Sequence, residues 1–145
     1  MNANHELATK LFSSGFNCAQ SVIAVFCEKY GMDKETALKI AGGLGGGFRS
    51  ADICGAVSGA VLVVGLKYGQ SIDGDTDTKQ NCSAKTIEFL NEFRARNKAI
   101  TCRDILQCDI TTPEGMAEAR SKNLFRTTCV DAVKSAVSIL EESGY

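Results

Sequence analysis

At 145 residues the chain has the length of one domain around one core, and its apolar (44%) and charged (23%) shares are those of an ordinary globular protein. No apolar run approaches the roughly 18 residues of a membrane span, and residues 1–10 lack the basic start and apolar stretch of a secretory signal. Lysine plus arginine (16) nearly balance aspartate plus glutamate (17), which argues against a nucleic-acid surface. We therefore expect one domain over residues 1–145, cytoplasmic, with no membrane and no nucleic-acid partner.

Apolar residues recur at helical spacing along nearly the whole chain, and Pro113 is the only proline. Helices are expected over 4–14, 18–30, 33 to the glycines at 42–47, 53–68, a long stretch after the polar segment 71–77, a short turn after 101, a stretch beginning at 113, and 122–142. On the long helix the expected buried side comprises Ile87, Phe89, Leu90 and Phe93. The predicted class is all-α: a single compact multi-helix bundle with a buried, glycine-rich central helix.

Cysteine is the residue type in which the composition departs from the average. The seven cysteines are Cys18, Cys27, Cys54, Cys82, Cys102, Cys108 and Cys129. In a reducing compartment a permanent disulfide framework is not expected, so several thiols favour metal binding or redox catalysis. A single free cysteine is otherwise most often a small core residue, and position in the fold decides between these interpretations.

Three cysteines closely follow residues that commonly cap helices. These cap and thiol pairs are Asn17 with Cys18, Asp52 with Cys54, and Thr101 with Cys102. Gln20 and Asp104 stand three residues after the first and third caps, as in a capping box. The first turn of a helix carries unpaired N–H groups and the positive end of the helix dipole, which lower a thiol pKa. We therefore expect these three cysteines to be held as thiolates.

Spacing sets the other four cysteines apart. Cys27 lies nine residues after Cys18, about half a turn away around a regular helix, so it is expected to be structural. Cys129 falls inside the expected last helix on an apolar side, where spacing alone favours core packing. Cys108 can join a site only if the chain turns before it, and Cys82 is expected to be incidental.

Several familiar thiol motifs are absent. The sequence contains no Cys-x-x-Cys, as in thioredoxin-like dithiols and zinc ribbons, and no Cys-x-x-Cys-His for covalent c-type haem. His5, the only histidine, lies near the terminus, which argues against a Cys–His catalytic pair. Any metal would be held by thiolates from distant segments, as helix bundles allow.

The glycines predict close helix packing. Gly55 and Gly59, four residues apart, form a small-residue groove in which another helix can approach the central one. Ser58, one turn after Cys54, is a candidate hydrogen-bond donor to that thiol. The stretch 42–47 follows a helix and lacks the Gly-Lys-Ser/Thr ending of a phosphate-binding loop, so it is expected to end a helix rather than bind a nucleotide.

An ordered set of motifs resembles a known family. The segments are FNCAQSV (16–22), GGGF (45–48), CGAVSGA (54–60), CRDIL (102–106) and Cys129. They are similar to the C_GCAxxG_C_C family of redox-active proteins, and the similarity covers nearly the whole chain. The resemblance implies that Cys18, Cys54, Cys102 and Cys129 are the characteristic cysteines, which moves Cys129 from the core into the site. The family is also similar to part of the split-Soret cytochromes, but without their haem motif no c-type haem is expected here.

Together, these observations predict a redox-active protein in which Cys18, Cys54, Cys102 and Cys129 act as catalytic thiols or as metal ligands. They would serve electron transfer or thiol–disulfide exchange, or hold an iron–sulfur cluster. For exchange, Cys54 is the candidate nucleophile and Cys18 or Cys102 the resolving thiol. Two alternatives stay open: a zinc or other metal-binding sensor module without turnover, and an interaction domain whose cysteines only fill the core. The expected partner is an oxidoreductase, and a homodimer is also expected.

Overall fold

The computed structural model describes residues 2–145. Its helices are α1 (Ala3–Ser13), α2 (Cys18–Phe26), η1 (Cys27–Tyr30), α3 (Lys34–Ile40), η2 (Gly47–Ala51), α4 (Gly55–Tyr68), α5 (Thr76–Asn97), α6 (Cys102–Leu106), α7 (Pro113–Ser121) and α8 (Thr128–Glu142). Here η1 is a 3-10 turn, and η2 is a π-helical turn interrupted by non-helical backbone angles at Phe48 and Arg49. Within residues 2–145 no strand forms beyond one isolated β-bridge, so the predicted all-α class is confirmed.

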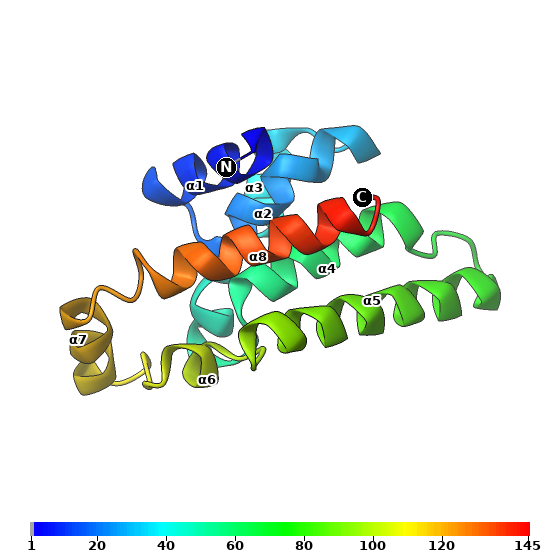
Figure 1. The fold of residues 1–145 in the computed structure, drawn as a ribbon. Coiled ribbons are helices and arrows are strands. Elements are labelled where there is room, and N and C mark those ends of the chain that lie inside the picture. The colour runs from blue at the N-terminus through cyan, green and yellow to red at the C-terminus, as the bar shows by residue number, and fades with distance from the viewer. Residues whose placement is uncertain (1) are drawn as a thin grey trace.

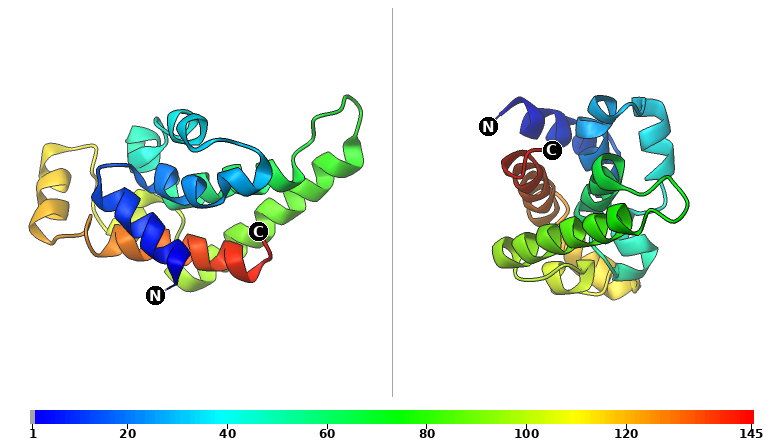
Figure 2. Two further views of the ribbon diagram at one scale, coloured as in Figure 1. Left: turned by 90° about the horizontal axis from the view of Figure 1, so that it is seen from above. Right: turned by 90° about the vertical axis from the view of Figure 1, so that its right-hand side faces the viewer.

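The three helices α2, α4 and α8 begin at the same end of the molecule, the end that carries α6 and α7 (Figure 1). They run from that end in roughly one direction, whereas the long α5 runs back toward it (Figures 1 and 2). Because a helix carries the positive end of its dipole at its N-terminus, this arrangement gathers several positive ends in one region. Cysteines at these starts are thereby brought close together.

The core surrounds α4, which packs against α2, α5 and α8. Its buried residues are Gly55, Ala56, Val57, Gly59, Ala60, Val63 and Val64. The helix is apolar nearly all round, as expected of a helix enclosed by others. The predicted buried, glycine-rich central helix is therefore confirmed, although it begins at Gly55 rather than at Ile53.

Two expectations about helices are wrong. On α5, Phe89 and Phe93 are buried, but Ile87 is 56% exposed, because this edge helix presents only a narrow face to the bundle. The last helix begins at Thr128 rather than at Lys122. Asn123 adopts a left-handed conformation (φ 58°) that ends the preceding turn, as asparagine tolerates better than most residues.

No helix in the described part of the chain combines the length and the apolar character needed to cross a membrane.

Candidate functional site

Cys18 is the first residue of α2, and the predicted capping box before it is confirmed. The Asn17 side chain accepts the Gln20 N–H at 2.8 Å, and the Gln20 side chain accepts the Asn17 N–H at 2.8 Å. The Asn17 amide also donates to the carbonyls of Ala41 and Gly42, each at 3.2 Å. The start of α2 is thereby fixed to the glycine-rich segment that follows α3.

A short backbone pairing brings Cys54 and Cys102 together. Ile53 and Thr101 form an isolated antiparallel bridge, and the two cysteines directly follow them. The N–H of each cysteine donates to a carbonyl of the opposite segment, at 2.7 Å from Cys54 and 2.8 Å from Cys102. Since successive residues of extended chain point to opposite faces, both thiols lie on the same face of this pairing. The Thr101 hydroxyl then accepts the Asp104 N–H at 3.2 Å, which confirms the predicted start of α6.

The glycine groove of α4 brings Cys18 to the same place. A Cβ atom built on Gly59 would lie 2.6 Å from the Ala19 carbonyl oxygen, too close for any side chain. A Cβ atom on Gly55 would lie 3.0 Å from the Cβ of Cys18. The backbone of α2 therefore rests directly on α4, as the small-residue spacing predicts, and Cys18 lies beside Cys54.

Cys129 is the second residue of α8, so it too lies in a first helical turn. Its N–H donates to the Leu124 carbonyl at 3.0 Å, and its side chain is half-buried. The core position expected from spacing alone is wrong, because the helix begins six residues later than predicted and places this thiol at its end. All four family-implied cysteines thus lie at the starts of helices.

The four thiols form two contacting pairs. Cys18 hydrogen-bonds to Cys129, and we name these two half-buried residues the outer pair. Cys54 hydrogen-bonds to Cys102, and these residues, 4% and 8% exposed, are the inner pair. Negative charge on either inner thiol raises the pKa of Cys18, so the two pairs form one electrostatic cluster. The structure therefore brings together all four predicted site residues.

A pocket of about 160 Å³ opens onto the cluster. It is lined by Phe12, Asn17, Cys18, Gly46, Arg49, Cys102, Leu106, Ile110, Met116, Phe125 and Cys129. Both outer cysteines and Cys102 of the inner pair line it, and Cys54 does not. A small molecule in this pocket would meet three thiols among mostly apolar side chains and one guanidinium group.

Cys54 is the thiol that the site favours as thiolate. A hydrogen bond from Cys102 lowers its pKa most, and the N–H groups of Ala56 and Val57 in the first turn of α4 lower it further. These donors outweigh burial, which acts in the opposite direction. Ser58 contributes nothing, because its hydroxyl donates to a carbonyl of its own helix at 3.3 Å. The prediction that Ser58 supports the thiolate is wrong.

The expectation that Cys18 and Cys102 are also thiolates is wrong. The pKa of Cys18 is raised well above its usual value, first by its hydrogen bond to Cys129 and then by burial. The pKa of Cys102 is raised strongly by its hydrogen bond to Cys54 and by burial. In a cluster of thiols one ionised sulfur is stabilised by its neighbour's S–H, so the neighbour keeps its proton. At Cys18 and Cys102, the adjacent sulfur and burial thus outweigh the effect of the helix start on the pKa.

This asymmetry predicts the pH dependence of thiolate formation. A titration followed by ultraviolet thiolate absorbance is expected to show a first ionisation below the ordinary thiol pKa, because a lowered pKa keeps the thiolate present at lower pH. Cys54→Ala is expected to remove this step, and Cys102→Ala to move it to higher pH by removing the S–H donor. Cys27→Ala, a buried thiol outside the cluster, serves as the control and leaves the step in place. A first step that survives Cys54→Ala would contradict the assignment.

The remaining cysteines lie outside the cluster. Cys27 is buried in η1, its thiol donates to the Ala24 carbonyl at 3.7 Å, and burial raises its pKa. Cys108 is buried in a small apolar cluster, and burial raises its pKa as well. Cys82 is half-buried on α5. The expected structural place of Cys27 fits these contacts.

Thiolates are ligands that zinc, copper(I) and iron–sulfur clusters prefer. Across residues 2–145, however, no three Cys, His, Asp or Glu side chains are arranged to hold one metal ion. The four thiols hydrogen-bond to one another in twos, Cys18 with Cys129 and Cys54 with Cys102.

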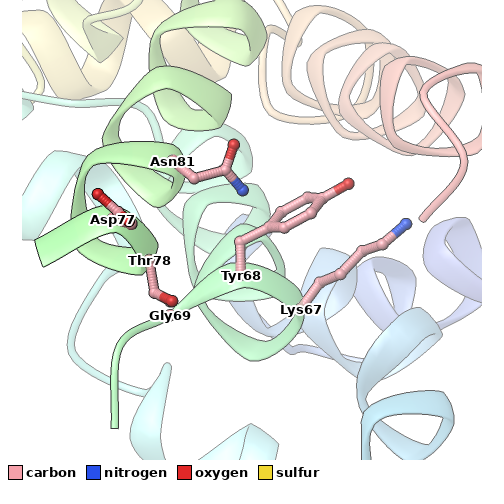
Figure 3. A pocket seen from close by; sticks show the side chains of 6 residues that line it. All are labelled: Lys67, Tyr68, Gly69, Asp77, Thr78 and Asn81. Carbon is pink, nitrogen blue, oxygen red and sulfur yellow. The ribbon is translucent and has the colours of Figure 1, made fainter. Parts of the chain in front are cut away.

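A second hollow, of about 360 Å³, lies at the far end of α4 and the start of α5 (Figure 3). It is lined by Lys67, Tyr68, Gly69, Asp77, Thr78 and Asn81. Lys67 reaches away from it to the C-terminal segment, where its ammonium donates to the Gly144 carbonyl at 2.9 Å and contacts the Tyr145 ring. No cysteine lines this hollow, which lies at the opposite end of α4 from Cys54.

Four cysteines from four helix starts thus lie in one cluster. A family model described as "Putative redox-active protein (C_GCAxxG_C_C)" matches residues 16–143. The chain belongs to the C_GCAxxG_C_C family. No curated protein and no solved structure matches the chain. The family match spans all four cysteines of the cluster, and its description agrees with redox chemistry.

Proposed function

We propose that this C_GCAxxG_C_C protein is a thiol–disulfide electron carrier whose inner and outer pairs each cycle between dithiol and disulfide. The observation that supports this best is the pairing of four cysteines from four helices, one pair buried and the other half-exposed at a pocket. All seven cysteines are free thiols in the structure. Thiols in this state suit a reducing compartment such as the cytoplasm, where disulfides are transient and functional.

The outer pair exchanges electrons with a redox partner, and the inner pair serves as the reservoir. When the partner has oxidised Cys18 and Cys129 to a disulfide, the Cys54 thiolate attacks the sulfur of Cys18. A Cys54–Cys18 bond forms, and Cys129 leaves as thiolate. The proximity of Gly55 to Cys18 supports this route, because no side chain separates the two helix starts.

Cys102 completes the transfer as the resolving thiol. Once Cys54 is in a disulfide, the negative neighbour that held the proton on Cys102 is gone, so the pKa of Cys102 falls. Its thiolate then attacks Cys54, forms the inner disulfide and releases Cys18. Two electrons have passed from the inner to the outer pair. The proton of Cys102 and one proton from solvent go to the two outer sulfurs.

The test is the electron capacity of the reduced protein. Titration with 2-hydroxyethyl disulfide under argon is expected to oxidise wild type by two equivalents, one for each pair. Cys102→Ala, which removes the inner disulfide, is expected to halve this value, and the matched control Cys82→Ala to leave it unchanged. A Cys102→Ala protein with the wild-type capacity would contradict the reservoir role.

The same anaerobic preparation also distinguishes thiol–disulfide exchange from metal binding. Four thiols at one end of a bundle are also the ligand set of a zinc or iron–sulfur centre. An ultraviolet–visible spectrum with elemental analysis decides between them: a colourless, metal-free protein is expected for the exchange protein. Visible absorption with bound iron and sulfide would favour the cluster, and stoichiometric zinc would favour the sensor module.

A further inference from the structure

Arg49 is a cation at the pocket over the thiols. A Cβ atom built on Gly46 would lie 3.4 Å from the Nη1 atom of Arg49, and the arginine side chain is exposed. Within residues 2–145, no carboxylate oxygen lies within ion-pairing distance of Arg49, unlike Arg96 and Arg103. Among the residues that line this pocket, Arg49 is the one with a charged side chain. The pocket therefore offers one positive charge that nothing in the described chain neutralises.

The backbone around Arg49 holds it there at a cost. Phe48 and Arg49 adopt left-handed conformations (φ 59° and 58°), which disfavour residues with a Cβ atom by about 1–2 kcal/mol each. Tight packing of Gly47 against Asp52 fixes the loop, because a Cβ atom on Gly47 would lie 2.4 Å from the Asp52 nitrogen. Strain retained beside a reactive site often serves to position a functional side chain.

The size and lining of the pocket limit what it accepts. The pocket has a volume of about 160 Å³. This space suits one half of a short-chain disulfide, with its sulfur at the thiols and its tail beside Ile110, Met116 or Phe125. An anionic group on the tail would complement Arg49.

We propose that the pocket binds small disulfides that carry a carboxylate, with Arg49 as the anion-recognition residue. The inference rests on the proposed function, since it names the substrate class of the outer pair. One cysteine of the outer pair loses its proton and attacks one sulfur of the bound disulfide, forming a protein–substrate disulfide and releasing one carboxylate-bearing thiolate. The second cysteine of the pair loses its proton, attacks the protein sulfur and releases the other half. The protein dithiol is oxidised by two electrons, and its two protons yield two small thiols.

The experiment compares two disulfides of similar length and different charge. Oxidation of the reduced protein is followed with 3,3′-dithiodipropionate, a dianion, and with neutral 2-hydroxyethyl disulfide, and peptide mapping identifies the oxidised cysteines. Arg49→Gln is expected to slow the reaction of the dianion by about threefold to fivefold. This is the rate change that corresponds to losing the attraction of one partly exposed charge pair. The rate with the neutral disulfide is expected to stay unchanged.

Two further variants test whether the charge and the position of Arg49 account for the effect. Arg49→Lys retains the charge and is expected to restore most of the dianion rate, and Arg120→Gln, an equal loss of charge on exposed α7, is expected to change neither rate. An Arg49→Gln protein that slows both disulfides equally, or an Arg120→Gln protein with the same selectivity loss, would overturn anion recognition by Arg49. If neither disulfide oxidises Cys18 and Cys129 even in wild type, the proposed function itself fails.

Discussion

Gly59→Ala is expected to lower the free energy of unfolding by about 2 kcal/mol, because it overpacks the contact between α2 and α4. The added Cβ atom would lie 2.6 Å from the Ala19 carbonyl oxygen and 2.8 Å from its Cα atom. Both are backbone atoms, so the conflict cannot be relieved by a side-chain rotation. In thermal unfolding, the melting temperature should fall by roughly 4–8 °C.

Gly65→Ala on the same helix is the matched control. No atom lies within 4 Å of a Cβ atom built at this position, so only helix propensity changes. Alanine there should stabilise the protein by up to about 1 kcal/mol. Equal effects of the two substitutions would show that α2 does not rest on α4 at Gly59. The Gly59→Ala protein should also transfer electrons more slowly between the pairs, because the conflict displaces Cys18 from Cys54.

Local sequence signals predicted much of the fold and three of the four thiol positions. Helix capping depends on residues close together in the sequence. The side chains of Asn17 and Thr101 each accept the N–H three residues later and so begin a helix. The spacing of Gly55 and Gly59 likewise predicted a helix at close range, since only absent side chains allow it. These features depend on a few neighbouring residues and can therefore be predicted from the sequence before any tertiary structure is known.

Long-range relations could not be predicted in the same way. The start of α8 depends on the left-handed Asn123 and on a turn closed against α7, and apolar spacing continues through both. The raised pKa of Cys18 depends on Cys129, which is distant in sequence. The position of Arg49 could not be predicted, because nothing in its local sequence shows that the chain places it at the pocket beside the thiols. Its position directly after GGGF was the only signal.

The largest effect is expected on the disulfide map of a cysteine variant, because each disulfide bond is either formed or absent. Mild oxidation, alkylation of the remaining thiols and peptide mass spectrometry should locate every bond. A disulfide requires Cα atoms within roughly 7 Å, and contacting thiols on fixed helix starts satisfy such geometry more readily than distant ones. Cys54→Ala should abolish the inner disulfide and leave the outer one.

The measurement that tests the central claim most directly is this map for the wild-type protein. The two dithiol pairs predict bonds between Cys54 and Cys102 and between Cys18 and Cys129, with alkylated thiols at Cys27, Cys82 and Cys108. A bond to any of these last three cysteines, or the absence of intrachain disulfides after oxidation, would contradict a redox centre built from two pairs.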